Sequence, residues 1–266
     1  HAWIEAEKQR PFAWQQAPLF RVQIHRRSDA QFNLTLSFHH AIVDGWSVAS
    51  LMTELLQRYF ACFGYAFAQP APLLASYHQF VALERAILAD DSCRHSWQTA
   101  LQDGSISKLP RWPQTAPRPA HADVVSLSRS LSAERSNRLQ QLARRAGVPL
   151  KSVLLAAHLN VLRVLNNQAD IMTGLVSNGR PETADGERVL GLFLNTLPFR
   201  LTLSGGSWLE LVQQVFAHER HLLPFRRYPL AAIQQMQGGA ALFETAFNFV
   251  NFHVYEGLAD LTGLAV

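Results

Sequence analysis

QFNLTLSFHHAIVDG, residues 31–45, is the stretch of the chain that decides the fold. Apolar and polar residues alternate strictly between residues 31 and 40, which is typical of a half-buried β-strand. After the Asp-Gly pair the period changes, because the apolar residues of 48–59 recur at helical spacing. We therefore expect a strand, a turn and a helix capped by Ser47, with the pair His39-His40 on the turn.

Strand parity separates the two histidines. If the alternation continues, His40 points with the apolar face and His39 with the polar face. An imidazole aimed into a dry interior or channel can accept a proton from an attacking amine or hydroxyl, and such general base catalysis contributes ~10²–10⁴ in rate. Asp44 then pairs with an arginine or orients the imidazole, and Gly45 lets the chain bend. The competing interpretation is a pair of surface-loop histidines followed by an ordinary Asp-Gly turn.

Other classes of site are disfavoured by what the sequence lacks. His40 and Asp44 supply two metal ligands at most, and no third ligand stands at a recognisable spacing, so we predict no metal site. The sequence contains no nucleophile elbow and no glycine-rich phosphate loop. The net charge of +4 comes almost wholly from arginines in scattered pairs, which disfavours a nucleic-acid surface and suits an acidic protein partner.

The second half of the chain predicts a second lobe. A proline-rich segment over 104–123 is the best candidate for a linker. Mixed helices and strands then predict an α/β or α+β protein of two lobes, 1–115 and 116–266. The expected elements of the second lobe are a helix capped by Ser132 and ending at Gly147, a buried helix over 150–165, strands over 170–176 and 191–201, a helix after the turn 204–207, and a strand over 243–252.

Three asparagines lie within apolar strands, namely Asn195, Asn248 and Asn251. A buried amide needs hydrogen-bond partners, so each is either a core residue or part of a channel wall. We favour the core for Asn248, and the sequence leaves the choice open for the other two.

The composition is that of a folded globular protein. Hydrophobic residues make up 48% and charged residues 17%, and no apolar run approaches the ~20 residues needed to cross a bilayer. Cys62 and Cys93 form no CxxC pair, so a reduced, cytoplasmic setting is the simplest interpretation. The chain starts without Met and without a signal pattern, and we expect it to be part of something longer.

The run HHxxxDG after a half-buried strand resembles the condensation-domain superfamily of non-ribosomal peptide synthetases, which shares its fold with chloramphenicol acetyltransferase. Three further stretches strengthen the resemblance and keep the order of the family. They are RPFAWQQAPLFR at 10–21, SNGRPE at 177–182 and GLFLNTLPFR at 191–200. The resemblance thus covers nearly the whole chain.

This resemblance implies two chloramphenicol-acetyltransferase-like lobes that form a V with a substrate tunnel between them. It implies amide bond formation between a donor thioester and an acceptor amine, each delivered on the phosphopantetheine arm of a carrier protein, with an adenylation domain adjacent. No cofactor is expected to bind the domain itself. His40, Asp44 and Gly45 are assigned to the catalytic centre, with Asp44 in an arginine salt bridge. Substrate contacts are expected from His39, Trp46, Ser177, Arg180 and Asn195.

The chain also departs from the family. The family's domain is longer, and its first strands, its arginine-bearing motif and its final section are not represented here. Asp44 therefore needs another arginine, for which Arg180 is the candidate. Both histidines of the motif are retained, which disfavours heterocyclisation, and 177–182 differs from the epimerisation pattern. An ester-forming acyltransferase and a catalytically silent docking module remain the alternatives.

Overall fold

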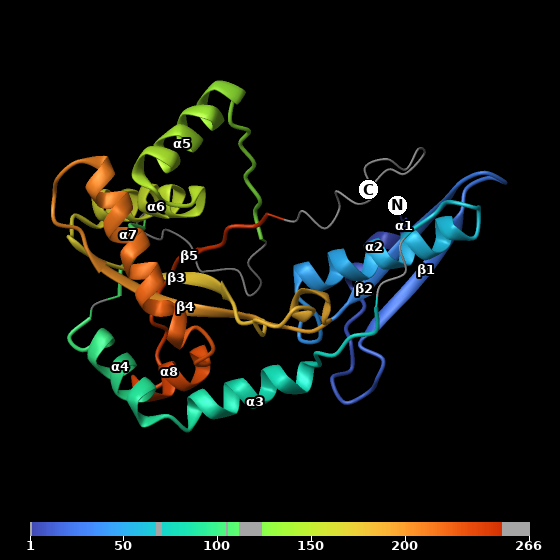
Figure 1. The fold of residues 1–266 in the computed structure, drawn as a ribbon, viewed down its shortest axis with the longest axis horizontal. Coiled ribbons are helices and arrows are strands. Elements are labelled where there is room, and N and C mark those ends of the chain that lie inside the picture. The colour runs from blue at the N-terminus through green and yellow to red at the C-terminus, as the bar shows by residue number, and fades with distance from the viewer. Residues whose placement is uncertain (1, 68–70, 105, 112–123, 252–266) are drawn as a thin grey trace. The chain divides into compact units, whose positions relative to one another are not determined.

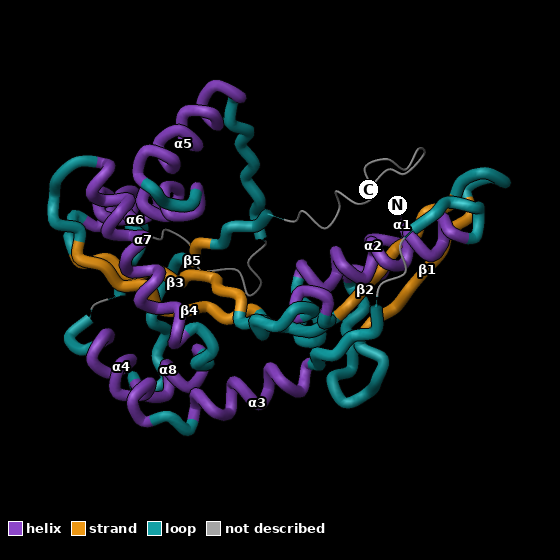
Figure 2. The backbone as a smooth tube through the Cα atoms, viewed as in Figure 1, coloured by secondary structure: helices purple, strands orange, loops and turns teal. Residues whose placement is uncertain are grey.

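The computed structural model describes residues 2–67, 71–104, 106–111 and 124–251. The chain divides into two compact units that alternate along the sequence, and their helices and short sheets confirm the predicted mixed α/β class (Figure 1, Figure 2). The first unit comprises His1–Ala82, Gly179–Leu194 and Val250–Val266, and the second comprises Leu83–Asn178 and Asn195–Phe249. The boundary predicted at residues 115 and 116 lies outside the described residues, as does most of the predicted linker.

The first unit contains a two-stranded ribbon followed by a long helix. β1 (Phe20–Arg26) and β2 (Phe32–Phe38) are antiparallel, which confirms the predicted strand. The alternation of burial predicted along β2 is wrong, since every residue of 34–38 is half-buried. In β1, Val22 and Ile24 are exposed. The described residues therefore leave neither face of the ribbon fully covered. The other elements of this unit are α1 (Ala2–Lys8), α2 (Gly45–Ala61), the start of α3 (Tyr77–Leu88) and the 3-10 turn η1 (Gly186–Arg188).

Helix α2 begins at Gly45 because Asp44 caps it. The backbone of Asp44 is extended, and its carboxylate accepts the N–H of Ser47 at 2.8 Å. The predicted cap, Ser47, is wrong, since this residue lies inside the first turn and is fully buried. Asp and Ser are comparable capping residues, and apolar spacing places a helix start only to within a few residues.

A three-stranded sheet with the order β4–β3–β5 forms the centre of the second unit. β3 (Asp170–Asn178) and β4 (Leu194–Thr202) confirm the two predicted strands. β5 (Ala246–Phe247) pairs with β3 in parallel. The helices of this unit are α4 (Asp91–Leu101), α5 (Ala133–Ala146), α6 (Leu150–Asn166), α7 (Trp208–Leu222), the 3-10 turn η2 (Leu223–Phe225) and α8 (Leu230–Met236).

Local signals determine where these helices begin and end. Ser132 caps α5 by accepting the N–H of Arg135 at 3.3 Å, and Gly147 ends it with a φ of 67°. Ser207 and Glu210 form a reciprocal capping box at the start of α7. Among the described helices none alone is long and apolar enough to cross a membrane, although α5 and α6, bent by 102°, are so as a pair.

Helix α6 carries the core of the second unit. Leu155, Ala156 and Leu159 have no exposed surface and belong to one apolar cluster with residues of α4, α7 and the sheet. The predicted burial of this helix is therefore confirmed, but for one face only. Val161 and Val164 remain 55% and 66% exposed, because no described residue covers the opposite face.

The aromatic run 243–252 forms much less strand than its composition predicts. Within 243–251, the part of this run that the structure describes, only Ala246 and Phe247 pair with β3. Asn248 and Asn251 are both exposed, so the predicted core position of Asn248 is wrong. Aromatic residues favour strands, but pairing needs a neighbouring strand in register, and β3 offers this run only two positions.

Candidate active site

The turn that carries the histidine pair begins where β2 ends. The N–H of His39 donates to the carbonyl of Leu19 at 2.9 Å, and the N–H of Ile42 donates to the carbonyl of His39 at 3.2 Å. His40 lies on this turn with an exposed side chain, 6.3 Å from the ring of Phe38. The ring does not lie in the packed interior of its unit, because strand parity ends with the strand at Phe38. Among the described residues the imidazole of His40 has no hydrogen bond or ion pair, so it is available to a substrate.

His39 is held more firmly than His40. Its ring is half-buried, 4.3 Å from the ring of Trp14 and 6.2 Å from that of Phe12. Its Nδ1 accepts the N–H of Ala41 at 3.1 Å, so the neutral ring carries its proton on Nε2. These contacts stabilise the turn, and they favour a structural role over the predicted substrate contact.

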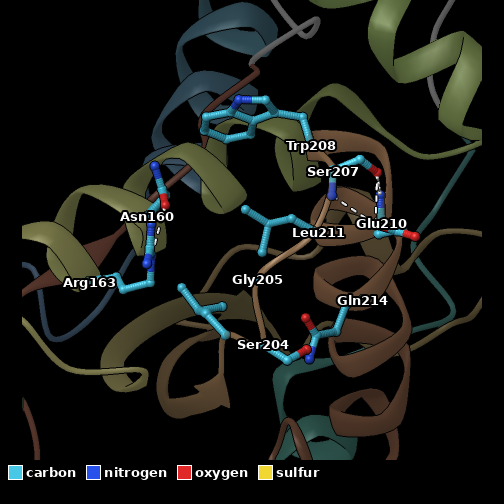
Figure 3. A pocket seen from close by; sticks show the side chains of 11 residues that line it. Asn160, Arg163, Ser204, Gly205, Ser207, Trp208, Glu210, Leu211 and Gln214 are labelled. Carbon is cyan, nitrogen blue, oxygen red and sulfur yellow. Dashed lines mark hydrogen bonds between the residues drawn. The ribbon is translucent and has the colours of Figure 1, made fainter.

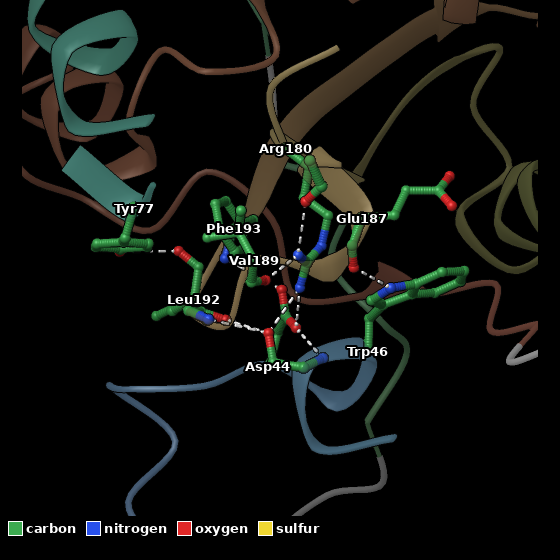
Figure 4. A network of polar contacts seen from close by, with 11 residues as sticks. Asp44, Trp46, Tyr77, Arg180, Glu187, Val189, Leu192 and Phe193 are labelled. Atoms are coloured by element: carbon green, nitrogen blue, oxygen red, sulfur yellow. Dashed lines mark hydrogen bonds and ion pairs between the residues drawn. The ribbon is translucent and has the colours of Figure 1, made fainter. Parts of the chain in front are cut away.

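Asp44 is the most deeply buried charged group next to the turn, with 1% of its surface exposed. Its Oδ1 accepts from the N–H of Ser47 at 2.8 Å and from Nη2 of Arg180 at 2.9 Å. Its Oδ2 accepts from the N–H of Phe193 at 3.2 Å (Figure 4). The carboxylate therefore holds the start of α2 against the loop that follows β3, which is a positioning role rather than a catalytic one.

Arg180 is the partner that the sequence suggested for Asp44. The guanidinium is 5% exposed, and it also donates to Oγ of Ser47 at 2.6 Å and to the carbonyls of Gly186 and Val189 at 3.3 and 2.5 Å. It stacks 4.1 Å from the ring of Phe193. Burial lowers the pKa of Arg180, and the Asp44 carboxylate opposes that change. The ion pair is thus buried and hydrogen-bonded on both sides, which such pairs require.

Ser47 and Gly191 complete this network, and the prediction missed both roles. Oγ of Ser47 donates to the carbonyl of Gly191 at 2.8 Å and accepts from its N–H at 3.0 Å, while the N–H of Asp44 donates to the same carbonyl at 3.0 Å. A side chain at Gly191 would collide with the ring of Tyr77, so only glycine fits. The one signal in the sequence was the position of Gly191 at the head of the stretch 191–200.

Gly45 and Trp46 lie directly beyond the turn. Gly45 is the first residue of α2 and is half-buried. The indole N–H of Trp46 donates to the carbonyl of Glu187 at 2.9 Å (Figure 4). Trp46 therefore ties α2 to η1, and this hydrogen bond uses the one polar group that the indole would offer a substrate.

Ser177 and Asn195 belong to the second unit. The amide nitrogen of Asn195 donates to the carbonyls of Arg226 and Tyr228 at 3.0 and 2.7 Å, and its oxygen accepts the N–H of Leu230 at 3.2 Å. This amide is occupied by the backbone, which fits a core residue better than the predicted substrate contact. Ser177 lines a cavity of about 110 Å³ within the same unit.

Two further observations bear on the chemistry. Among the described residues, no three histidine, cysteine or acidic side chains gather as metal ligands would. A cavity of about 650 Å³ opens between α6 and the start of α7, beside Arg163 and Trp208, and none of the predicted site residues lines it (Figure 3). The chemically available group near the motif is therefore the imidazole of His40, placed on a turn that Asp44 and Arg180 hold.

Comparisons with known proteins place the chain in a family. A family model described as "Condensation domain" matches residues 1–263. AMB antimetabolite synthetase AmbE of Pseudomonas aeruginosa is 39% identical over 253 residues, which are 95% of this chain and 12% of that protein. Malpinin synthetase of Mortierella alpina is 32% identical over 221 residues, which are 80% of this chain and 3% of that protein.

Solved structures show the same fold. The first condensation domain of the CDA synthetase superposes with a TM-score of 0.74 at 22% identity, covering 95% of this chain and 57% of that one. The chain therefore spans a little over half of that domain, and a small part of each synthetase. The likeness confirms the predicted fold class of chloramphenicol-acetyltransferase-like proteins.

Proposed function

The chain belongs to the condensation domain family, and on that premise we propose that it supports amide bond formation between a donor thioester and an acceptor amine. Both substrates arrive on phosphopantetheine arms of carrier proteins, and the domain binds no cofactor of its own. An adenylation domain that loads a carrier is the expected neighbour, in a cytoplasmic synthetase. The two synthetases reported above, of which this chain matches only a small part, support such a multidomain setting.

The exposed imidazole of His40 is the observation that carries the proposal. It lies two residues after the end of β2, and the first turn of α2 is fixed four residues later by the buried pair of Asp44 and Arg180. A catalytic side chain on a turn between two rigid elements keeps its position while remaining accessible. His40 thus has both the availability and the support that a general base needs.

The proposed reaction proceeds in two steps. The nitrogen of the acceptor amine attacks the carbonyl carbon of the donor thioester, and the imidazole of His40 accepts the proton that this nitrogen loses. The tetrahedral intermediate then collapses, the carbon–sulfur bond breaks, and the thiolate of the donor arm leaves as a thiol by taking up the proton that His40 holds. The product is an amide on the acceptor arm, and His40 returns to its starting state.

The test replaces His40 by alanine in the full-length protein and follows product by mass spectrometry, with both carriers loaded. We expect a loss of ~10²-fold or more in rate. His78→Ala is the matched control, since His78 is an exposed histidine of the same unit. An unchanged rate for His40→Ala, or an equal loss in the control, contradicts the proposal.

Two other functions are separated by the same assay. An acceptor that carries a hydroxyl in place of the amine distinguishes ester formation from amide formation. A catalytically silent docking module forms no product with either acceptor. The intact His40 and the complete network around Asp44 favour an active centre over a silent one, because a silent module needs neither.

A further inference from the structure

Arg21 of β1 is the centre of a second polar cluster in the first unit, apart from the one around Asp44. Its partner across the ribbon is Ser37, two residues before His39. The Nε of Arg21 donates to Oε1 of Glu7 at 2.5 Å, and the side chains of this ion pair are only 8% exposed for Glu7 and 23% for Arg21. The pair therefore fixes the end of α1 against the ribbon.

The same guanidinium holds the segment that follows α1. Its Nη2 donates to the carbonyl of Arg10 at 2.9 Å, and its carbon Cζ lies 3.8 Å from the centre of the Phe12 ring. A planar guanidinium can donate directional hydrogen bonds and stack on a ring at the same time, which the ammonium of lysine cannot do. Arg21 therefore sets the position of Phe12 relative to β1.

Phe12 connects this cluster to the histidine turn. Its ring lies edge to face with that of His39 at 6.2 Å, a separation typical of interacting aromatic rings. The Nδ1 of His39 then accepts the N–H of Ala41 at 3.1 Å. His40 lies between the two residues that this hydrogen bond joins. A continuous series of contacts thus runs from Glu7 to both neighbours of His40.

Apolar burial contributes little to this part of the unit. Phe20 and Val22, which flank Arg21 on β1, are both exposed, and Phe12 is only half-buried. Trp14, the other aromatic neighbour of His39, is 68% exposed. With so little apolar surface removed from water, the position of Phe12 depends mainly on the hydrogen bonds and the stacking of Arg21.

We propose that Arg21 is a positioning residue of the condensation reaction, which holds the turn of His40 through Phe12 and His39. This inference rests on the proposed function, since it requires that His40 acts on the substrates. Arg21 acts through the two intervening side chains and not on the substrates themselves. Its loss should therefore lower kcat and leave the KM for the loaded acceptor carrier unchanged.

The test replaces Arg21 by methionine in the full-length protein and follows product by mass spectrometry, with both carriers loaded. We expect kcat to fall about fivefold, which corresponds to the loss of one hydrogen bond at the turn. Arg21→Lys keeps the charge but not the planar fork, and should show the same loss. Arg26→Met is the matched control, since Arg26 lies on the same strand and pairs with Asp29 on the surface, and its kcat should stay within about twofold.

A double variant separates positioning from a general loss of stability. If Arg21 acts through His39, Arg21→Met lowers kcat by less than about twofold further when His39 is already alanine. Two independent losses of about fivefold would instead multiply to about 25-fold. Multiplied losses, an unchanged kcat in Arg21→Met, a raised KM at unchanged kcat, or an equal loss in the Arg26 control overturns the proposal.

Hydrogen exchange of the whole chain gives a readout that needs no activity. Arg21→Met should speed exchange of the Ala41 amide, which His39 binds, about fivefold, and leave the Ser47 amide, which Asp44 binds, unchanged. Equal acceleration of both amides indicates general loosening of the unit and overturns the proposal. A large loss of rate in His40→Ala with none in Arg21→Met overturns this proposal alone, whereas an unchanged rate in His40→Ala overturns the proposed function as well.

Discussion

The two units differ in what stabilises each of them internally. The second unit has one extensive apolar cluster, with α6 in its centre. The first has a small apolar cluster around Phe193, and the ion pair of Asp44 and Arg180 is buried beside it. In an apolar core the stabilising free energy is distributed over many weak contacts. In a buried ion pair it depends on a few polar contacts, and removing one partner leaves the other charge unpaired. The chemically important turn therefore depends on polar contacts that single substitutions can break.

The largest expected effect comes from breaking the polar centre. Arg180→Met leaves the Asp44 carboxylate buried without its cation, which should cost about 3–5 kcal/mol of unfolding free energy. The measurement is urea unfolding, together with hydrogen exchange of the Ser47 amide that Asp44 binds. Arg58→Met is the control, since Arg58 pairs with Glu54 on the surface of α2 and should matter by less than about 1 kcal/mol. Equal losses in the two variants would show that burial of the pair is unimportant.

Truncating the apolar centre should cost somewhat less. Leu159→Ala leaves a cavity in the core of the second unit and should lower the unfolding free energy by about 3 kcal/mol. Val164→Ala on the exposed face of the same helix should change it by less than about 0.5 kcal/mol. A large loss at Val164 in urea unfolding would indicate that a partner covers this face in solution.

A smaller effect is expected at His39, which supports the turn through one hydrogen bond. His39→Ala removes the acceptor of the Ala41 N–H, worth about 1 kcal/mol, and should slow product formation about fivefold. His39→Asn keeps an acceptor at the same distance along the side chain and should recover most of the rate. Single-turnover rates with loaded carriers measure both variants, and an equal loss in the two would exclude the hydrogen bond as the cause.

The smallest expected effect is a difference between the two units in how their stability depends on pH. Burial lowers the pKa of His158 and of His218, so their unfolded forms bind more protons below the ordinary histidine value of about 6.5. The N–H groups of Ala75 and Leu74 lower the pKa of Asp185 in the first unit, and its contribution is lost only below about pH 3.9. Lowering the pH from about 7 to 5 should therefore destabilise the second unit before the first, which thermal unfolding at each pH measures. His158→Gln with His218→Gln should remove that dependence, and a pH response that persists in the double variant would contradict the assignment.

The sequence predicted well wherever structure depends on near neighbours. The cap at Ser132, the end at Gly147 and the turn before α7 are all set by residues within one helical turn, and all were confirmed. The predicted cap at Ser47 failed because Asp44, three residues earlier, accepts the N–H of Ser47, while Oγ of Ser47 is bound to Arg180 and Gly191, which lie far away in the sequence. The strand over 243–252 failed because its pairing depends on β3, which lies far from it in the sequence.

The sequence by itself determined the order of strand, turn and helix around HHxxxDG, the family and the mixed α/β class. Only the tertiary structure decided which histidine is exposed, since strand parity stops at Phe38 and the turn sets the direction of His40. It also decided that Arg180 pairs with Asp44, 136 positions away in the sequence, and that the same guanidinium donates a hydrogen bond to Oγ of Ser47. The physical reason is range: propensity and capping act over a few residues, whereas burial and ion pairing depend on segments that meet only when the chain folds.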